Sequence, residues 1–301
     1  MNRPAIGVDV GGTKVLGVVV DTEGRVLAEK RRPTPTGSPE ELCATIDEVV
    51  AVLGADDRNR GAPIGVGLPG LVDSNGVLCF SPHLATAQGL DLRTHWPSRW
   101  PPARVVNDAA AAARAERAWG AGRGLDDFLF VALGTGIGGA LVRDGVVQDG
   151  PRGFAGEYGH MVVDPDGEVC PCGGRGCWER YASAAGLERF ERVAGGSGEG
   201  GGPGVVARAR ALDEASLGAF GALATWLALG VANLIAALDV SDVVIGGGLA
   251  REGDLFVPAA AARLADLLEG ASARPPIRWH LAGCGERAGA LGAGLVAREG
   301  A

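Results

Sequence analysis

The stretch that decides the fold is AIGVDVGGTKVLGVVV, residues 5–20. Residues 5–10 and 15–20 are apolar runs that contain a single charged residue, and Gly11 and Gly12 lie between them. Short apolar runs separated by a glycine pair predict two β-strands joined by a tight turn. We therefore expect the chain to begin with a glycine hairpin.

Three polar residues of this segment are candidates for nucleotide binding. The glycines let the backbone approach an anion, and the Thr13 hydroxyl and the Lys14 ammonium can hold its oxygens. Asp9, at the end of a strand, can hold Mg²⁺ through water. The P-loop pattern G-x-x-x-x-G-K-[ST] is absent. The alternative is an ordinary hairpin turn, but the flanking Asp, Thr and Lys favour phosphate binding.

A similar pattern returns about 120 residues later, which predicts two related halves. Residues 128–133 and 140–143 are expected to be strands, with the turn GTGIGG between them. The turn matches G-x-G-x-x-G, but a dinucleotide site needs a helix directly after it, whereas Asp144-Gly145 predicts a hairpin turn. A third glycine turn follows the apolar strand at residues 242–245. The candidate phosphate-binding residues of these turns are Gly134, Thr135, Gly136, Gly246, Gly247 and Gly248.

Bulk properties limit the kinds of partner. The chain has 301 residues, of which 47% are hydrophobic, and a net charge of −8, which disfavours a nucleic-acid surface. No signal peptide is visible. Residues 217–238 carry no charge and could span a bilayer by length. They are rich in Ala and Gly and include Thr225 and Asn233, so we expect a buried core helix.

Other elements follow from local signals. Residues 25–29 and 64–68 are expected to be strands, and residues 39–53 a helix with Ser38 as its N-cap. Residues 195–204 are nearly all Gly, with one Ser, one Glu and one Pro, which predicts a surface loop. The Ala- and Gly-rich tail from Gly285 is expected to be helical.

Asn107 and Asp108 end a strand and precede an alanine-rich helix. Asp108 could simply be the N-cap of that helix. A carboxylate at a strand end can also accept the proton of an attacking hydroxyl. The two interpretations are compatible, and both stay open at this point.

A compact set of soft ligands is the most specific local signal. Cys170, Cys172 and Cys177 lie within eight positions, and His160 precedes them. Three thiolates and one imidazole form a closed, tetrahedral structural zinc site, with no position left for a catalytic water. The alternative is a set of free buried thiols. Glu157 and Glu179 bracket the cluster and could accept hydrogen bonds from sugar hydroxyls, although residue type alone favours solvated surface carboxylates.

These motifs, in this order, resemble the ROK family of sugar kinases and repressors, and within it the ATP-dependent bacterial glucokinases. The resemblance runs from Asp9 to about Gly294. Its most specific stretch is C-x-C-G-x-x-G-C-x-E at residues 170–179. Residues 9–14 and 133–139 are similar to the family's phosphate motifs, 154–160 to its sugar segment, and 246–249 to its adenosine-side turn.

The resemblance implies an α/β, actin-like ATPase (ribonuclease H-like) fold with two domains around a cleft. We expect an N-terminal domain at residues 1–108, a larger domain at 109–285, and a returning helix at 286–301. It also implies a cytoplasmic, glycolytic enzyme that uses ATP, catalytic Mg²⁺ and structural Zn²⁺ and forms a homodimer or homotetramer, with neither nucleic acid nor membrane as partner. Asp108 is the implied base for a hexose 6-hydroxyl, and the implied sugar-binding residues are Asn107, Glu157, His160 and Glu179.

Two departures from the family pattern bear on the sugar. The family commonly has Asp-Ala-Asn where this chain has Asp108-Ala109-Ala110, and often Pro-Asn-Leu where it has Pro82-His83-Leu84. Both weaken the inference of glucose more than that of a kinase. The alternatives are another acceptor (an N-acyl hexosamine, mannose or fructose), polyphosphate as donor, or a sugar-responsive regulator. Since the first expected strand starts at about Ala5, no helix-turn-helix precedes it, which disfavours a regulator.

Overall fold

The computed structural model describes residues 3–95 and 103–299 and has a mixed α/β fold. Contacts divide the chain into two compact units. The first comprises Met1–Asp126, Ala140–Gly156 and Gly283–Ala301, and the second comprises Asp127–Gly139 and Glu157–Ala282. The α/β class expected from the sequence is confirmed, and the domain boundaries near residues 108 and 285 stay a prediction.

The first unit is built on a five-stranded sheet with the order β3-β2-β1-β4-β8. Strands β1 and β2 form the antiparallel hairpin that the glycine pair predicts, and β1, β4 and β8 run parallel. Strand β3 is longer than expected because it pairs with β2 along its whole length. The bounds are β1 (Ala5–Val10), β2 (Lys14–Val20), β3 (Val26–Pro33), β4 (Ile64–Leu68) and β8 (Arg104–Asn107).

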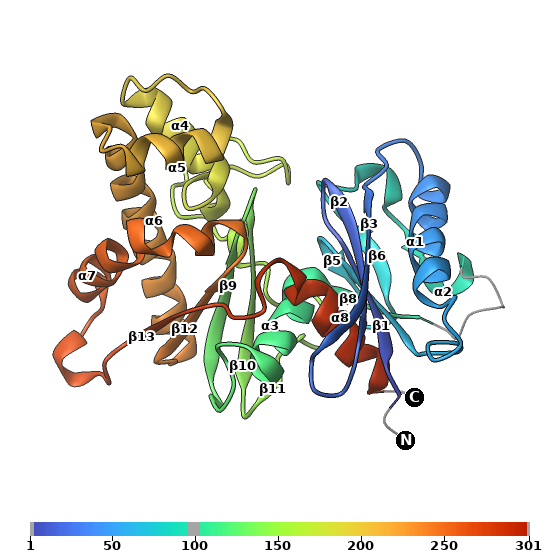
Figure 1. Cartoon of the computed structure of the whole chain (residues 1–301). Coiled ribbons are helices and arrows are strands. Elements are labelled where there is room, and N and C mark those ends of the chain that lie inside the picture. Colours follow the sequence, from blue (N-terminus) through green and yellow to red (C-terminus); the bar gives the residue numbers. More distant parts are fainter. Residues whose placement is uncertain (1–2, 96–102, 300–301) are drawn as a thin grey trace. The chain divides into compact units, whose positions relative to one another are not determined.

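Helices cover both faces of this sheet (Figure 1). Helix α1 (Pro39–Leu53) covers one face, and its N-cap is Ser38, as predicted. Helices α3 (Asp108–Trp119) and α8 (Ala288–Arg298) cover the other. Strand β2 alternates between the two cores, since Val15 and Val19 face α1 whereas Leu16 and Val18 face α8.

Small residues bring α8 very close to the sheet. A Cβ at Gly7 of β1 would lie 1.8 Å from the Ala290 carbonyl oxygen, and one at Gly65 of β4 would lie 1.9 Å from that of Ala293. No side chain fits at either glycine, so helix and sheet meet backbone to backbone. The Ala- and Gly-rich tail is therefore a helix, as predicted, and it packs within the first unit.

The second sheet repeats the strand order of the first. Its order is β11-β10-β9-β12-β13, with β9, β12 and β13 parallel. The turn after β10 has positive φ at Asp144 and Gly145, as the predicted hairpin requires. The expected relation between two halves is therefore present in the topology. The bounds are β9 (Phe128–Leu133), β10 (Ile137–Arg143), β11 (Val146–Val147), β12 (Asp242–Gly246) and β13 (Arg278–Leu281).

Four helices complete the second unit: α4 (Ala184–Val193), α5 (Gly201–Arg210), α6 (Glu214–Leu238) and α7 (Val257–Leu267). Among the described residues, α6 is the one helix long and apolar enough to cross a membrane. It packs against α4, α5 and α7 and is a core helix, as expected.

The loop expected at residues 195–204 is wrong at its C-terminal end, because α5 begins at Gly201. Its start is held by the Gly202 N–H, which donates to Glu188 at 2.7 Å, and by the buried side chain of Val205. These tertiary contacts offset the low helix propensity of glycine and proline.

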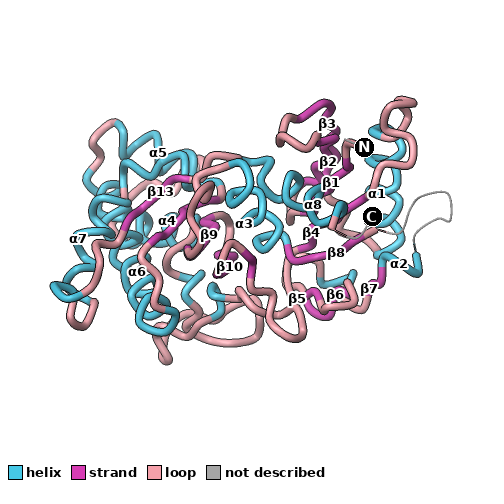
Figure 2. Tube along the Cα trace, turned by 90° about the horizontal axis from the view of Figure 1, so that it is seen from below, coloured by secondary structure: helices cyan, strands magenta, loops and turns pink. Residues whose placement is uncertain are grey.

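The remaining elements are short. Strands β5 (Leu71–Val72), β6 (Val77–Phe80) and β7 (Leu90–Asp91) form a small antiparallel sheet in the first unit (Figure 2). The other short helices are α2 (Leu92–His95), η1 (Ala85–Ala87), η2 (Tyr158–His160), η3 (Trp178–Arg180), η4 (Gly248–Leu255), η5 (Ala271–Ala273) and η6 (Gly285–Arg287).

Candidate active site

The first glycine turn is fixed by backbone hydrogen bonds. The Gly11 N–H donates to the Lys14 carbonyl at 2.8 Å. Thr34, just after β3, donates its hydroxyl to the Gly11 carbonyl at 2.6 Å and its N–H to the Thr13 carbonyl at 3.1 Å. Nothing in the local sequence marks Thr34 as a partner of this turn, and it was not predicted.

Packing does not explain the two glycines of this turn. A Cβ at Gly11 would come no closer than 3.4 Å to a neighbour, the Lys14 carbonyl oxygen. One at Gly12 would have its nearest neighbours at 3.9 Å, on the exposed His83 side chain. Neither glycine has a left-handed φ. The space above the turn is therefore open to a ligand that needs close access to the backbone.

The Lys14 ammonium already has a partner in the first unit. It lies 2.9 Å from a carboxylate oxygen of Glu286, which also binds the Arg31 guanidinium at 2.6 Å. The two cations hold the pKa of Glu286 down at about 2. The bridge keeps a positive charge beside the glycine turn, although Lys14 and Glu286 are more than a third exposed.

Two carboxylates lie close together near the C-terminal ends of the parallel strands β1 and β8. Asp9 of β1 and Gly67 of β4 are register partners, and a Cβ on Gly67 would lie 3.7 Å from Asp9 Oδ1 and 3.4 Å from Asp108 Cα. Surrounding protein atoms, together with the negative charge of Asp108, raise the pKa of Asp9 to about 7, against the attraction of Lys14. Burial raises the pKa of Asp108 to about 6, against a hydrogen bond from the Ala109 N–H. Both side chains keep some contact with solvent.

Asn107, rather than Asp108, is the N-cap of α3, so the capping interpretation of Asp108 is wrong. The Asn107 side chain accepts a hydrogen bond from the Ala110 N–H at 2.9 Å and donates one to the Gly70 carbonyl at 3.1 Å. Asp108 is the first helical residue and accepts from the Ala109 N–H at 2.8 Å. Because Asn107 already caps the helix, the Asp108 carboxylate keeps acceptor capacity for another group.

The second glycine turn has the same open character without any ionisable residue. The Gly134 N–H donates to the Gly136 carbonyl at 3.0 Å, and the exposed Thr135 lies between them. A Cβ at Gly134 would meet nothing within 4 Å. The Gly134 carbonyl accepts from the Ala184 N–H at 2.9 Å, which ties the turn to the start of α4.

The third glycine turn contains glycines of two kinds. Gly246 ends β12 and is buried. Gly247 has φ +79°, and a Cβ there would lie 2.3 Å from the Leu133 carbonyl, so its glycine is needed by the fold. Gly248 has open space around it. Only Gly248 is thus left without a structural reason to be glycine.

The predicted metal-ligating side chains come together in the second unit. The ligand atoms of His160, Cys170, Cys172 and Cys177 all lie within 4.8 Å of one another. Cys172 and Cys177 sulfurs are 3.7 Å apart, and Cys170 Sγ is 3.8 Å from His160 Nδ1. Ligands of a tetrahedral zinc ion at ordinary bond lengths lie about 3.5–3.8 Å apart. The donor set and its spacing therefore fit a structural zinc ion.

The same imidazole links the cluster to the two predicted sugar-binding glutamates. His160 Nδ1 faces the sulfurs, and Nε2 lies 3.7 Å from Glu157. Glu179 Oε1 lies 3.1 Å from Cys170 Sγ, and its Oε2 accepts from the Ile137 N–H at 3.4 Å, at the second glycine turn. The cluster, the glutamates and this turn are thus one connected network.

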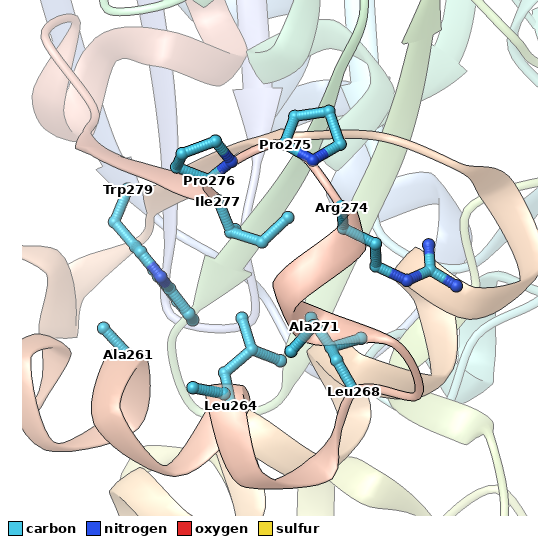
Figure 3. Close-up of a pocket in the computed structure, with 10 residues that line it drawn as sticks. Ala261, Leu264, Leu268, Ala271, Arg274, Pro275, Pro276, Ile277 and Trp279 are labelled. Carbon is cyan, nitrogen blue, oxygen red and sulfur yellow. The ribbon is translucent and has the colours of Figure 1, made fainter.

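The hollows within the two units differ in character. In the second unit, a pocket of about 180 Å³ between α7 and β13 is lined mainly by apolar side chains, including Leu264, Ile277 and Trp279 (Figure 3). Its described lining includes none of the predicted site residues. In the first unit, a hollow of about 750 Å³ has a mixed lining, in which apolar residues such as Val105 alternate with polar and charged ones that include Asn107 and Arg114.

Comparisons with known proteins agree with this arrangement. The ROK family profile matches residues 5–299. The chain is 34% identical to a glucokinase of Streptomyces coelicolor, with 98% of this chain and 97% of that protein covered. It is 31% identical to an N-acetylmannosamine kinase of Escherichia coli, with 97% and 98% covered.

The crystal structure of a ROK family glucokinase from Streptomyces griseus in complex with glucose and AMPPNP superposes with a TM-score of 0.89. It is 34% identical to this chain, and the match covers 98% of this chain and 99% of that one. The chain therefore belongs to the ROK family, has the expected actin-like ATPase fold and is a sugar kinase.

Proposed function

We propose that the protein transfers the γ-phosphoryl group of ATP to the 6-hydroxyl of a hexose, with glucose as the main acceptor. The observation that carries this proposal is the Asp108 carboxylate, whose pKa is raised to about 6 beside a second carboxylate. A base is most effective when its pKa lies near the working pH. The named ligands of the Streptomyces griseus relative, glucose and AMPPNP, support the choice of substrates.

In the proposed reaction, Asp108 accepts the proton of the sugar hydroxyl while the hydroxyl oxygen forms a bond to the γ-phosphorus. The bond from that phosphorus to the bridging oxygen breaks, and ADP leaves. Such a transfer depends mainly on positioning and charge neutralisation. Asp9 would hold Mg²⁺ through water, and that charge would favour the ionised form of Asp9 in spite of its raised pKa. The nucleotide-binding residues are Gly11, Gly12, Thr13, Lys14, Gly134, Thr135, Gly136, Gly246, Gly247 and Gly248.

The sugar would be held by Asn107, Glu157, His160 and Glu179. Zinc on His160, Cys170, Cys172 and Cys177 would fix the segment that bears the two glutamates, and His160 Nε2 would remain available to the sugar. We also propose a cytoplasmic, glycolytic enzyme that forms a homodimer or homotetramer.

A second acceptor class has support of its own. An N-acylated hexosamine is favoured by the E. coli relative named N-acetylmannosamine kinase. The family's usual Asn is replaced by Ala110 in this chain, and His83, which lies over the first glycine turn, replaces another. Because a single hydroxyl contact can decide specificity, these positions bear on the choice of sugar.

The test is a coupled assay of ADP release by the purified protein with ATP and glucose, mannose, fructose or the N-acetyl hexosamines. Because transfer from polyphosphate yields no ADP, polyphosphate is tested as donor by measuring the sugar phosphate formed. We expect the highest kcat/KM with glucose and ATP, and about one zinc per chain by metal analysis. If no sugar in this set supported ADP release, the proposed reaction would be contradicted. If an N-acetyl hexosamine were clearly preferred, it would be the main acceptor in place of glucose.

A further inference from the structure

The Asp9 side chain lies against the first turn of the last helix, far away in sequence. Gly289 is the second residue of α8. A Cβ built on Gly289 would lie 2.6 Å from both Cγ and Oδ1 of Asp9, and 2.9 Å from Oδ2. Its three nearest neighbours are thus all atoms of one carboxylate group, at distances that real Cβ atoms do not show.

Backbone conformation does not explain Gly289. It lies inside a helix and has no left-handed φ. Glycine makes a helix less stable than alanine does, by up to about 1 kcal/mol in a helix interior. Another requirement must therefore favour glycine here, and the carboxylate of Asp9 occupies the space that a methyl group would need.

The neighbouring glycines of α8 serve other contacts. A Cβ at Gly292 would lie 1.7 Å from the Ala111 carbonyl of α3, and one at Gly294 would lie 2.6 Å from a methyl carbon of Val20 in β2. Those two glycines allow the helix to pack against the rest of the unit. Gly289 differs from both because its closest contact is a charged group of the proposed site.

We infer that Gly289 is a positioning residue for the phosphoryl-transfer site: its missing side chain lets the Asp9 carboxylate occupy its place beside β4. This inference rests on the proposed role of Asp9 in holding Mg²⁺. A methyl group at position 289 would push the carboxylate aside by about 1 Å, a displacement that can lower a rate by up to about a hundredfold.

The first test is a double-mutant cycle on stability, which needs no activity. We expect Gly289→Ala to lower Tm by about 2–6 °C in the wild-type background. In the Asp9→Ala background, the same substitution should leave Tm unchanged or raise it, because the clash is gone and alanine favours the helix. If Gly289→Ala alone does not fold, the double variant should still fold. Equal effects in both backgrounds, or a double variant that does not fold either, would overturn the inference.

The second test separates positioning from general packing. At saturating ATP and sugar, we expect Gly289→Ala to raise the Mg²⁺ concentration for half-maximal rate about tenfold. The matched control is Gly294→Ala, which crowds Val20 from the same helix and should lower Tm without changing this Mg²⁺ requirement. Wild-type Mg²⁺ dependence in folded Gly289→Ala, when Asp9→Ala alters it, would overturn the inference. Wild-type dependence in Asp9→Ala itself would instead refute the proposed role of Asp9.

Discussion

The two sheets share one strand order, yet their glycine turns are equipped differently. The first turn is flanked by Asp9 and Lys14, and Asp108 lies nearby. The second turn has no ionisable residue between Gly134 and Gly139. Its Ile137 N–H donates to Glu179, which also contacts Cys170 of the Cys–His cluster. The two turns thus share a strand arrangement but differ in the side chains beside it. Charged residues flank the first turn, whereas the second turn offers open backbone at Gly134.

The largest expected effect is on turnover, from a substitution of Asp108 near the charged first turn. Asp108→Asn keeps an oxygen that can accept from the Ala109 N–H but removes the base. We expect kcat to fall by about 10²-fold or more, as for loss of a general base. Sugar and nucleotide affinities, measured by calorimetry, should stay within about threefold of wild type. Near-normal turnover in this variant would refute the base assignment.

The next effect concerns the Cys–His cluster of the second unit. Cys172→Ser removes one of the four ligands, and we expect zinc to be lost and the sugar KM to rise by about 10–100-fold. The reason is that His160 belongs to the cluster and Glu179 contacts it through Cys170. The matched control is Cys79→Ser, since Cys79 is an exposed thiol of the first unit. A zinc-free variant with the wild-type sugar KM would show that the metal does not support the sugar segment.

The open backbone of the second turn can be tested with a single methyl group. Gly134→Ala places a Cβ where no protein atom lies within 4 Å, so the fold should tolerate it. If a phosphate occupies that space, we expect the ATP KM to rise about tenfold. Gly221→Ala is the control, because position 221 in α6 is equally open and lies in none of the predicted motifs. An unchanged ATP KM in Gly134→Ala would mean that the opening serves no nucleotide.

Sequence patterns predicted the parts of both sites that are local in the chain. The glycine hairpins, helix α1 with its Ser38 cap, and the cluster of His160 with three cysteines all depend on residues that lie near one another in the chain, so spacing reveals them. Thr34, just after β3, bonds to the first turn, whereas Glu286 and Gly289 contact Lys14 and Asp9 from the far end of the chain. Glu286 is 272 residues away from Lys14. Such partners are fixed by packing, which no local pattern records. The interpretation of Asp108 as the N-cap of α3 is wrong for a related reason, because Asn107 and Asp108 are both good caps and the Gly70 carbonyl favours Asn107.

The smallest effect concerns stability and follows from the raised pKa of Asp108. The folded pKa of about 6 exceeds the ordinary value of 3.8, so the folded protein binds this proton more tightly than the unfolded chain. The Asp108 contribution to stability therefore falls as pH rises from about 4 to 6. Above that range, the ionised carboxylate destabilises the folded protein to its full extent. Without nucleotide, Asp108→Asn should be more stable than wild type by about 1–2 kcal/mol at pH 8, with no difference near pH 3.5.

Thermal melts of the two proteins across this pH range would measure the difference, and Asp213→Asn in the second unit is the matched control. The pKa of Asp213 is lowered, chiefly by the hydrogen bond from the Ser216 N–H at the start of α6, so its substitution should act in the opposite direction at pH 8. Ionised Asp213 caps a helix and stabilises the fold, whereas ionised Asp108, the proposed base, destabilises it. If Asp108→Asn were no more stable than wild type at any pH, Asp108 would not be such a destabilised group, and the main observation behind its role as base would be lost.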